Sequence, residues 1–70
     1  MILMSSFAER LKELRTEKGL STKELGKHVG VSGMAISRWE RSAGVPVLDN
    51  VVALANFFEV TVGYMAGVEN

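Results

Sequence analysis

The stretch VSGMAISRWE, residues 31–40, carries the signals of a short helix with two different faces. Ser32 is a good N-cap residue, because its hydroxyl can accept a hydrogen bond from a free amide of the first turn. Val31 and Ile36 hold the two positions of a hydrophobic staple, which fixes the angle at which the chain enters the helix. At helical spacing Ile36 and Trp39 share one side, and the opposite side holds small, polar or basic residues and therefore faces outward: Gly33, Met34, Ser37, Arg38 and Arg41.

A second short helix is predicted immediately upstream, from the stretch LSTKEL, residues 20–25. Ser21 and Glu24 form a capping box, and Leu20 and Leu25 form another hydrophobic staple. Gly30 suits the left-handed residue that ends such a helix. Two helices joined by residues 30–32 make a helix-turn-helix.

This pattern resembles the phage repressor and Cro family of DNA-binding domains, and the likeness extends to the segment from Phe57 to Gly67. The resemblance implies an all-α fold, a compact five-helix lambda-repressor-like domain. It also implies a partly buried ion pair between Arg15 and Glu40, with a structural role. At the Gly26 position the family usually has Ala, where the two helices of the motif press together.

Five helices are expected in a single domain covering residues 1–70, at about residues 5–18, 22–29, 33–41, 47–58 and 62–66. Ser5 or Ser6 is expected to cap the first helix, and Thr61 the last, which Gly67 ends. The fourth helix begins with Val47 where the family has a capping hydroxyl, so its start is open to a shift. Its buried stripe is predicted to hold Leu48, Val51, Leu54, Ala55 and Phe58.

Composition excludes several classes of function. There is no cysteine, and the single histidine, His28, has no cluster of metal-ligating residues around it, so neither a metal nor a cofactor is expected. No Cys/His or Ser/His/Asp constellation and no phosphate-binding glycine loop points to an enzyme or to a small-molecule ligand. The apolar runs are too short for a membrane span or signal peptide. A cytoplasmic protein of a bacterial cell, encoded by the host, a phage or a mobile element, is expected.

The net charge is zero, which taken alone argues against a nucleic-acid partner. The distribution argues for one. Residues 1–41 hold all eight basic residues and five acidic ones, a net charge of +3, and residues 42–70 hold three acidic residues and no basic one, a net charge of −3. The positive charge therefore belongs to the half that contains the helix-turn-helix.

A helix that enters a major groove reads base edges with the outward residues near its N-terminal end. The predicted base contacts are Arg38, Ser37, Met34 and Gly33, with Arg38 the strongest because its guanidinium can donate two hydrogen bonds to guanine. Met34 is suited to a thymine methyl. Helix starts and basic side chains favour phosphate, which selects Ser21, Thr22, Lys23, Ser32, Arg41 and Lys27.

The leading prediction is a Cro-like repressor that binds a two-fold-symmetric double-stranded DNA operator as a homodimer. Val45, Val52 and Phe57 are candidates for the dimer surface. An antitoxin, or the headpiece of a larger repressor, remains a second reading within DNA binding. The different class is a protein-interaction module that kept the fold and lost DNA binding, which the zero net charge and the outward Met34 favour.

Overall fold

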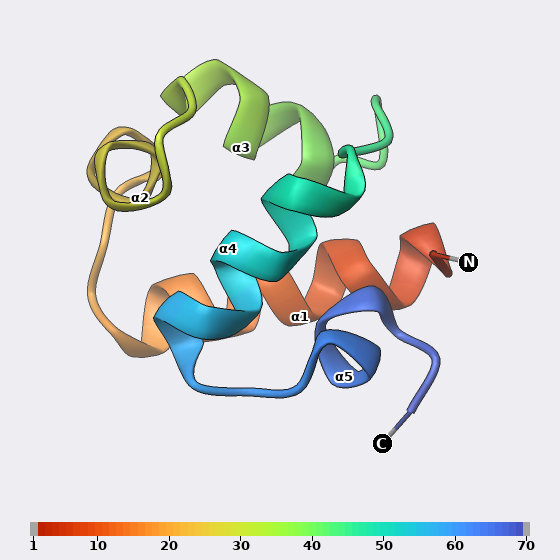
Figure 1. Cartoon of the computed structure of the whole chain (residues 1–70). Coiled ribbons are helices and arrows are strands. Elements are labelled where there is room, and N and C mark those ends of the chain that lie inside the picture. Colours follow the sequence, from red (N-terminus) through yellow and green to blue (C-terminus); the bar gives the residue numbers. More distant parts are fainter. Residues whose placement is uncertain (1, 70) are drawn as a thin grey trace.

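The computed structural model describes residues 2–69, and the terminal residues 1 and 70 of the predicted domain lie outside the described part. Within that part five helices follow one another: α1 (Met4–Glu17), α2 (Thr22–Val29), α3 (Gly33–Glu40), α4 (Leu48–Phe58) and α5 (Val62–Ala66). α4 runs through the middle of the molecule, with α2 and α3 on one side and α1 and α5 on the other (Figure 1). The predicted all-α class and order of helices are confirmed.

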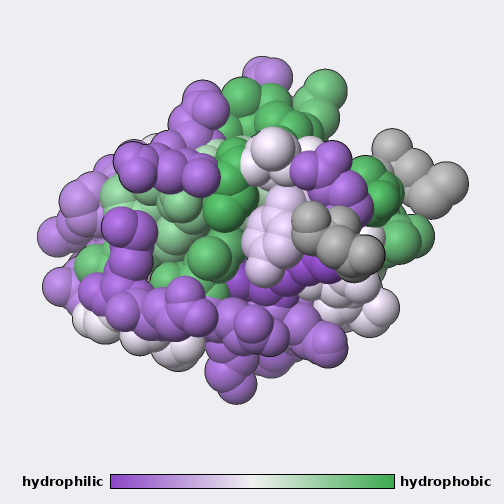
Figure 2. Space-filling view, turned by 90° about the horizontal axis from the view of Figure 1, so that it is seen from below, coloured by the Kyte–Doolittle hydropathy of each residue, from purple (hydrophilic) through white to green (hydrophobic). Residues whose placement is uncertain are grey.

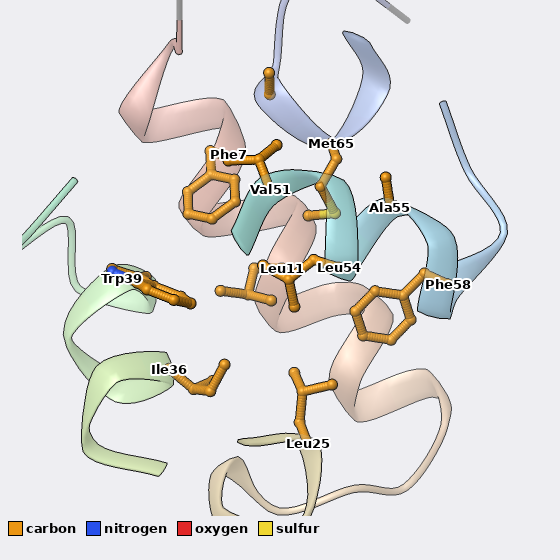
Figure 3. Close-up of a cluster of buried hydrophobic side chains, with 11 residues drawn as sticks. Phe7, Leu11, Leu25, Ile36, Trp39, Val51, Leu54, Ala55, Phe58 and Met65 are labelled. Carbon is orange, nitrogen blue, oxygen red and sulfur yellow. The ribbon is translucent and has the colours of Figure 1, made fainter. Parts of the chain in front are cut away.

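Every helix contributes to one apolar core (Figure 3). Ile36 and Trp39 point inward from α3, toward Leu11 of α1 and Leu25 of α2. The full set of core residues is Phe7, Leu11, Leu25, Ile36, Trp39, Val51, Leu54, Ala55, Phe58, Met65 and Ala66. The position of α3 is therefore set by its own two buried side chains.

The start of α1 differs from the prediction. Neither Ser5 nor Ser6 caps it: the helix begins at Met4, and Leu3 occupies the N-cap without a side-chain hydrogen bond. The amide of Leu3 donates instead to the carbonyl of Ala66 in α5, at 3.0 Å. Ile2 and Met4 pack against the core, so apolar contact moves the N-cap two or three residues ahead of the hydroxyl residues expected to hold it.

The start of α4 also differs from the prediction. Val47 is the N-cap, again without a side-chain hydrogen bond, and Leu48 is 65% exposed and not buried. At helical spacing Leu48 lies on the same side of α4 as Val51 and Ala55. It is the first residue of the helix, however, and it lies beyond the elements that cover the buried side of α4. The buried part of α4 thus starts at Val51.

The face opposite α3 has its own apolar surface. In Figure 2, which looks at the molecule from below the view of Figure 1, hydrophobic residues form a band bordered by hydrophilic ones. No helix among residues 2–69 is long and apolar enough to cross a membrane. In the same range no group of three or more His, Cys, Asp or Glu residues is placed to hold a metal ion.

Candidate nucleic-acid interface

Caps define where α2 and α3 begin. The Ser32 hydroxyl accepts a hydrogen bond from the amide of Ala35 at 3.0 Å. At α2 the capping box is complete, because the Ser21 hydroxyl accepts from the amide of Glu24 at 3.0 Å and the Glu24 carboxylate accepts from the amide of Ser21 at 2.9 Å. These interactions lower the pKa of Glu24. The hydrogen bond from the Ser21 amide has the largest effect, and hydrogen bonding with the Ser21 hydroxyl has the second largest. Both helix starts are therefore in well-defined positions.

Two glycines bring these helix starts together. A methyl group on Gly26 would overlap the carbonyl oxygen of Val31, and one on Gly33 would lie 2.9 Å from the Cα of Lys23. Neither space is available to a side chain, so the backbones of α2 and α3 are in direct contact. The alanine that the family usually has at Gly26 does not fit this crossing. The first turns of α2 and α3 consequently lie side by side.

This contact gathers several predicted phosphate and base contacts around one surface hollow of about 610 Å³. Its lining combines the start of α2 with the outward face of α3: Thr22, Lys23, Gly33, Met34, Ser37 and Arg41. Ser21 and Ser32 are exposed caps at the same helix starts. Lys27 is exposed in the last turn of α2 and does not line the hollow. An anion in this hollow would meet amide groups of two helix starts and two cationic side chains.

Arg38 lies on the other side of Met34, against the loop between α3 and α4. Its Nη2 donates to the carbonyl of Ala43 at 3.4 Å, a long hydrogen bond, and its guanidinium passes beside Gly44. A second hollow, of about 420 Å³, lies between α3 and this loop, and it is lined by Ser32, Met34, Ala35, Arg38, Trp39, Gly44 and Val45. Arg38 lies on the outward face, as predicted, but its contact with the loop was not predicted, because it leaves no local pattern in the sequence.

The ion pair between Arg15 and Glu40 is present in the structure. Arg15 Nε donates to one carboxylate oxygen of Glu40 at 2.6 Å, and Nη2 donates to the other at 2.9 Å. A third nitrogen, Nη1, donates to the carbonyl of Leu20 at 2.8 Å, a contact that the sequence did not predict. The hydrogen bond to Glu40 raises the pKa of Arg15 against the opposing effect of burial. Arg15 thus ties the last turn of α3 and the residue before Ser21 to α1.

The three candidates for a dimer surface differ in their exposure and in their neighbours. Val45 is 71% exposed and lies beside Arg38, whereas Val52 is half-buried in the middle of α4. The ring of Phe57, near the opposite end of α4, stacks on His28 with centroids 4.8 Å apart, and Lys18 Nζ lies 5.5 Å from the same ring. Phe57 is therefore already engaged within the molecule.

Comparison with known proteins agrees with this geometry. A family model described as a helix-turn-helix domain matches residues 6–64. The chain is 39% identical over 56 residues to the HTH-type transcriptional activator BcrR of Enterococcus faecalis, covering 80% of this chain and 28% of BcrR. It is 39% identical over 57 residues to repressor protein C2 of Salmonella phage P22, covering 81% of this chain and 26% of C2. The chain thus spans about a quarter of the length of these relatives.

The structure is also similar to that of the P22 c2 repressor solved in complex with a synthetic operator. The two superpose with a TM-score of 0.84 at 35% sequence identity, over 90% of this chain and 96% of that one. The chain therefore belongs to the helix-turn-helix domain family, and its fold is that of the lambda-repressor-like regulators.

Proposed function

We propose that this protein is a sequence-specific regulator of transcription that binds double-stranded DNA with α3 in the major groove. The observation that carries the proposal is the convergence on one face of the outward side of α3, two helix starts and the side chains of Lys23, Arg38 and Arg41. The solved P22 c2 repressor, which shares the fold, was determined on a synthetic operator. We expect the protein to act in the cytoplasm, without catalysis, cofactor or small-molecule ligand.

Within this proposal the exposed side of α3 reads base edges. Arg38 releases the long hydrogen bond to Ala43 and donates to O6 and N7 of a guanine, an exchange that replaces one weak contact with two stronger ones. Ser37 and Met34 lie on the same side, and Gly33 allows the helix to approach the bases closely. Only Arg38 carries a pair of donors, so it is expected to supply most of the discrimination.

The phosphate backbone is bound at the edges of that surface. Lys23 and Arg41 supply charge beside the start of α2, while amides at the starts of α2 and α3 supply hydrogen-bond donors. The assigned phosphate contacts are Ser21, Thr22, Lys23, Ser32, Arg41 and, one turn away, Lys27. Of the two nearby carboxylates, Glu40 is paired with the cation of Arg15, whereas the exposed Glu24 accepts the capping-box hydrogen bond and keeps its negative charge next to Lys23. Such contacts position the protein and make affinity depend on salt.

A homodimer on a two-fold-symmetric operator is the proposed working form, because one recognition helix reads few base pairs. Val45, Val52 and Phe57 remain the proposed dimer residues. We assign the main contact to the loop before α4, where Val45 is 71% exposed, and regard Val52 and Phe57 as accessory. The relatives named above include an activator and a repressor, so membership of the family does not fix the direction of regulation. Expression of a reporter gene under a selected operator tests repression of the Cro type.

Selection from a random duplex library at moderate salt tests the proposal. The native protein should enrich a two-fold-symmetric site containing G·C pairs, and Arg38→Ala should lose preference at those pairs while keeping weak, salt-sensitive binding. Lys12→Ala is the matched control, because it removes one exposed positive charge from α1 outside both hollows. Loss of all enrichment and of low-salt binding in the native protein would reject DNA binding.

The second candidate function is a protein-interaction module. Met34 is 72% exposed in the middle of the proposed DNA surface, and the loop from Ala43 to Val45 carries no charge. An antitoxin would also bind DNA and would have a protein partner in addition. The headpiece of a larger repressor would also bind DNA and would be joined to a further segment. If selection fails, the surface formed by residues 33–41 is the place to test for a protein partner.

A further inference from the structure

The methionines of the described residues differ sharply in their access to water. Met34 on α3 is 72% exposed, whereas Met65 on α5 is completely buried in the core. Met4 is half-buried and packs against the core. A thioether is oxidised only when its sulfur meets an oxidant dissolved in water, so susceptibility follows exposure. Among the described methionines, Met34 is therefore the one that a dissolved oxidant reaches most easily.

Met34 also has a central position on the proposed DNA surface. It lines both hollows, the one beside Lys23 and Arg41 and the one beside Arg38, and no other lining residue is common to the two. Met34 belongs neither to the core nor to the partly buried residues packed against it. A change in the polarity of this side chain therefore acts on the DNA surface and leaves the packing of the five helices unchanged.

The chemistry open to this side chain is oxygen transfer to its sulfur. The chain contains no cysteine, so the thioethers of its methionines are its only sulfur groups. When a thioether reacts with hydrogen peroxide, the sulfur lone pair attacks one peroxide oxygen, an S–O bond forms, the O–O bond breaks and water leaves. The sulfur loses two electrons, and the peroxide gains them. Methionine sulfoxide reductases reverse the change with electrons from thiols, which become a disulfide as the oxygen leaves in water.

We propose that Met34 is an oxidation site through which peroxides reversibly weaken the binding of DNA. Bound DNA excludes water from the outward face of α3, so the polar sulfoxide must give up hydrogen bonds to water when DNA binds. The sulfoxide oxygen is also an acceptor close to the cationic side chains of the two hollows, where it competes with phosphate and guanine for their donors. The inference rests on the proposed function, because the oxidation acts through the DNA surface described above.

Treatment of the full chain with hydrogen peroxide, at increasing doses, tests this inference. Mass spectrometry of peptides measures oxidation at each methionine, and fluorescence anisotropy measures affinity for the selected operator. Met34 should gain one oxygen atom at lower doses than Met65, and affinity should fall about tenfold in step with oxidation of Met34, in line with the loss of water from an unpaired polar group. Thermal unfolding of the protein oxidised at Met34 should stay native. Methionine sulfoxide reductase with a thiol should restore affinity.

Two substitutions at Met34 separate the loss of the thioether from the gain of a polar group. Met34→Leu has no sulfur to oxidise, so the ratio of its affinities before and after treatment should be close to one, whatever its starting affinity. Met34→Gln carries a polar group of similar length, so it should bind the operator more weakly than Met34→Leu without any treatment. Met4→Leu is the matched control, because it removes a methionine that lines neither hollow and should respond to peroxide as the native protein does.

Several outcomes would overturn the oxidation site and leave the proposed function standing. These are unchanged operator binding after complete oxidation of Met34, an equal loss of affinity in treated Met34→Leu, and oxidation of Met65 at doses that spare Met34. Failure of the untreated native protein to select any operator would overturn both the oxidation site and the proposed function.

Discussion

Glu40 places a carboxylate at the end of α3 with only 8% of its side chain exposed, and Arg15 meets it with the side chain 14% exposed. A charge this far from water is stable only when it is paired and hydrogen-bonded. Three guanidinium nitrogens of Arg15 are used, two by Glu40 and one by the Leu20 carbonyl. The pair therefore controls the orientation of the helix-turn-helix on α1 and leaves DNA contacts to other residues.

Replacing one partner of this pair should cost more than replacing both. Arg15→Met strands the Glu40 carboxylate and Glu40→Leu strands the guanidinium, so each should lower the free energy of unfolding by about 3 kcal/mol. The double variant Arg15→Met/Glu40→Leu should recover most of that loss, because it leaves no unpaired charge. Thermal unfolding followed by circular dichroism measures all three. Losses that simply add in the double variant would contradict this interpretation.

Between elements, the decisive feature is the backbone contact of α2 with α3 at Gly26 and Gly33. Helix propensity alone favours alanine over glycine by about 1 kcal/mol at an interior position such as Gly26. Here the crossing forbids the alanine methyl, and the close approach sets the spacing between the first turns of α2 and α3. Gly26 thus lowers helix propensity, but it allows the close helix contact that sets the geometry of the proposed phosphate site.

Gly26→Ala should therefore destabilise the protein and weaken DNA binding, although alanine is the better helix former. Moving the Val31 carbonyl away from the new methyl should lower the free energy of unfolding by about 1–3 kcal/mol, the usual cost of overpacking. Gly63→Ala is the matched helical control, because the atoms nearest to its methyl belong to the flexible side chain of Glu69, which can shift at the cost of one exposed hydrogen bond with Thr61, and not to backbone. Denaturant unfolding and anisotropy with the selected operator measure both effects. A Gly26→Ala variant as stable as the native protein would show that the crossing tolerates a methyl.

At the scale of the whole molecule, signals that act within one helical turn were predictable. The caps at Ser21, Ser32 and Thr61 lie where the sequence places them, because each depends on residues three positions apart. The start of α1 was missed because packing of Ile2 and Met4 on distant elements overrides the hydroxyl signal.

Contacts between distant segments left no local pattern. Arg10 of α1 donates to the carbonyls of Tyr64 and Glu69, at 2.6 and 2.7 Å, and its guanidinium lies 4.3 Å from the centroid of the Tyr64 ring. This contact holds α5 and the segment after it against α1, on the side of the molecule away from α3 (Figure 1). The loop beside Arg38 was missed for the same reason, so the outward residues were predictable while their surroundings were not.

Mapping the DNA surface by nuclear magnetic resonance tests sequence reading by α3 most directly. Amide chemical shifts of the native protein are followed during titration with the selected operator and with a scrambled duplex of equal length. We expect both duplexes to perturb amides near Thr22, Lys23 and Arg41, and only the operator to perturb residues 33–38 strongly. The segment held by Arg10 at Tyr64 and Glu69 should stay unchanged. Perturbations centred on α1 and α5, or the same response of residues 33–38 to both duplexes, would contradict sequence reading by α3.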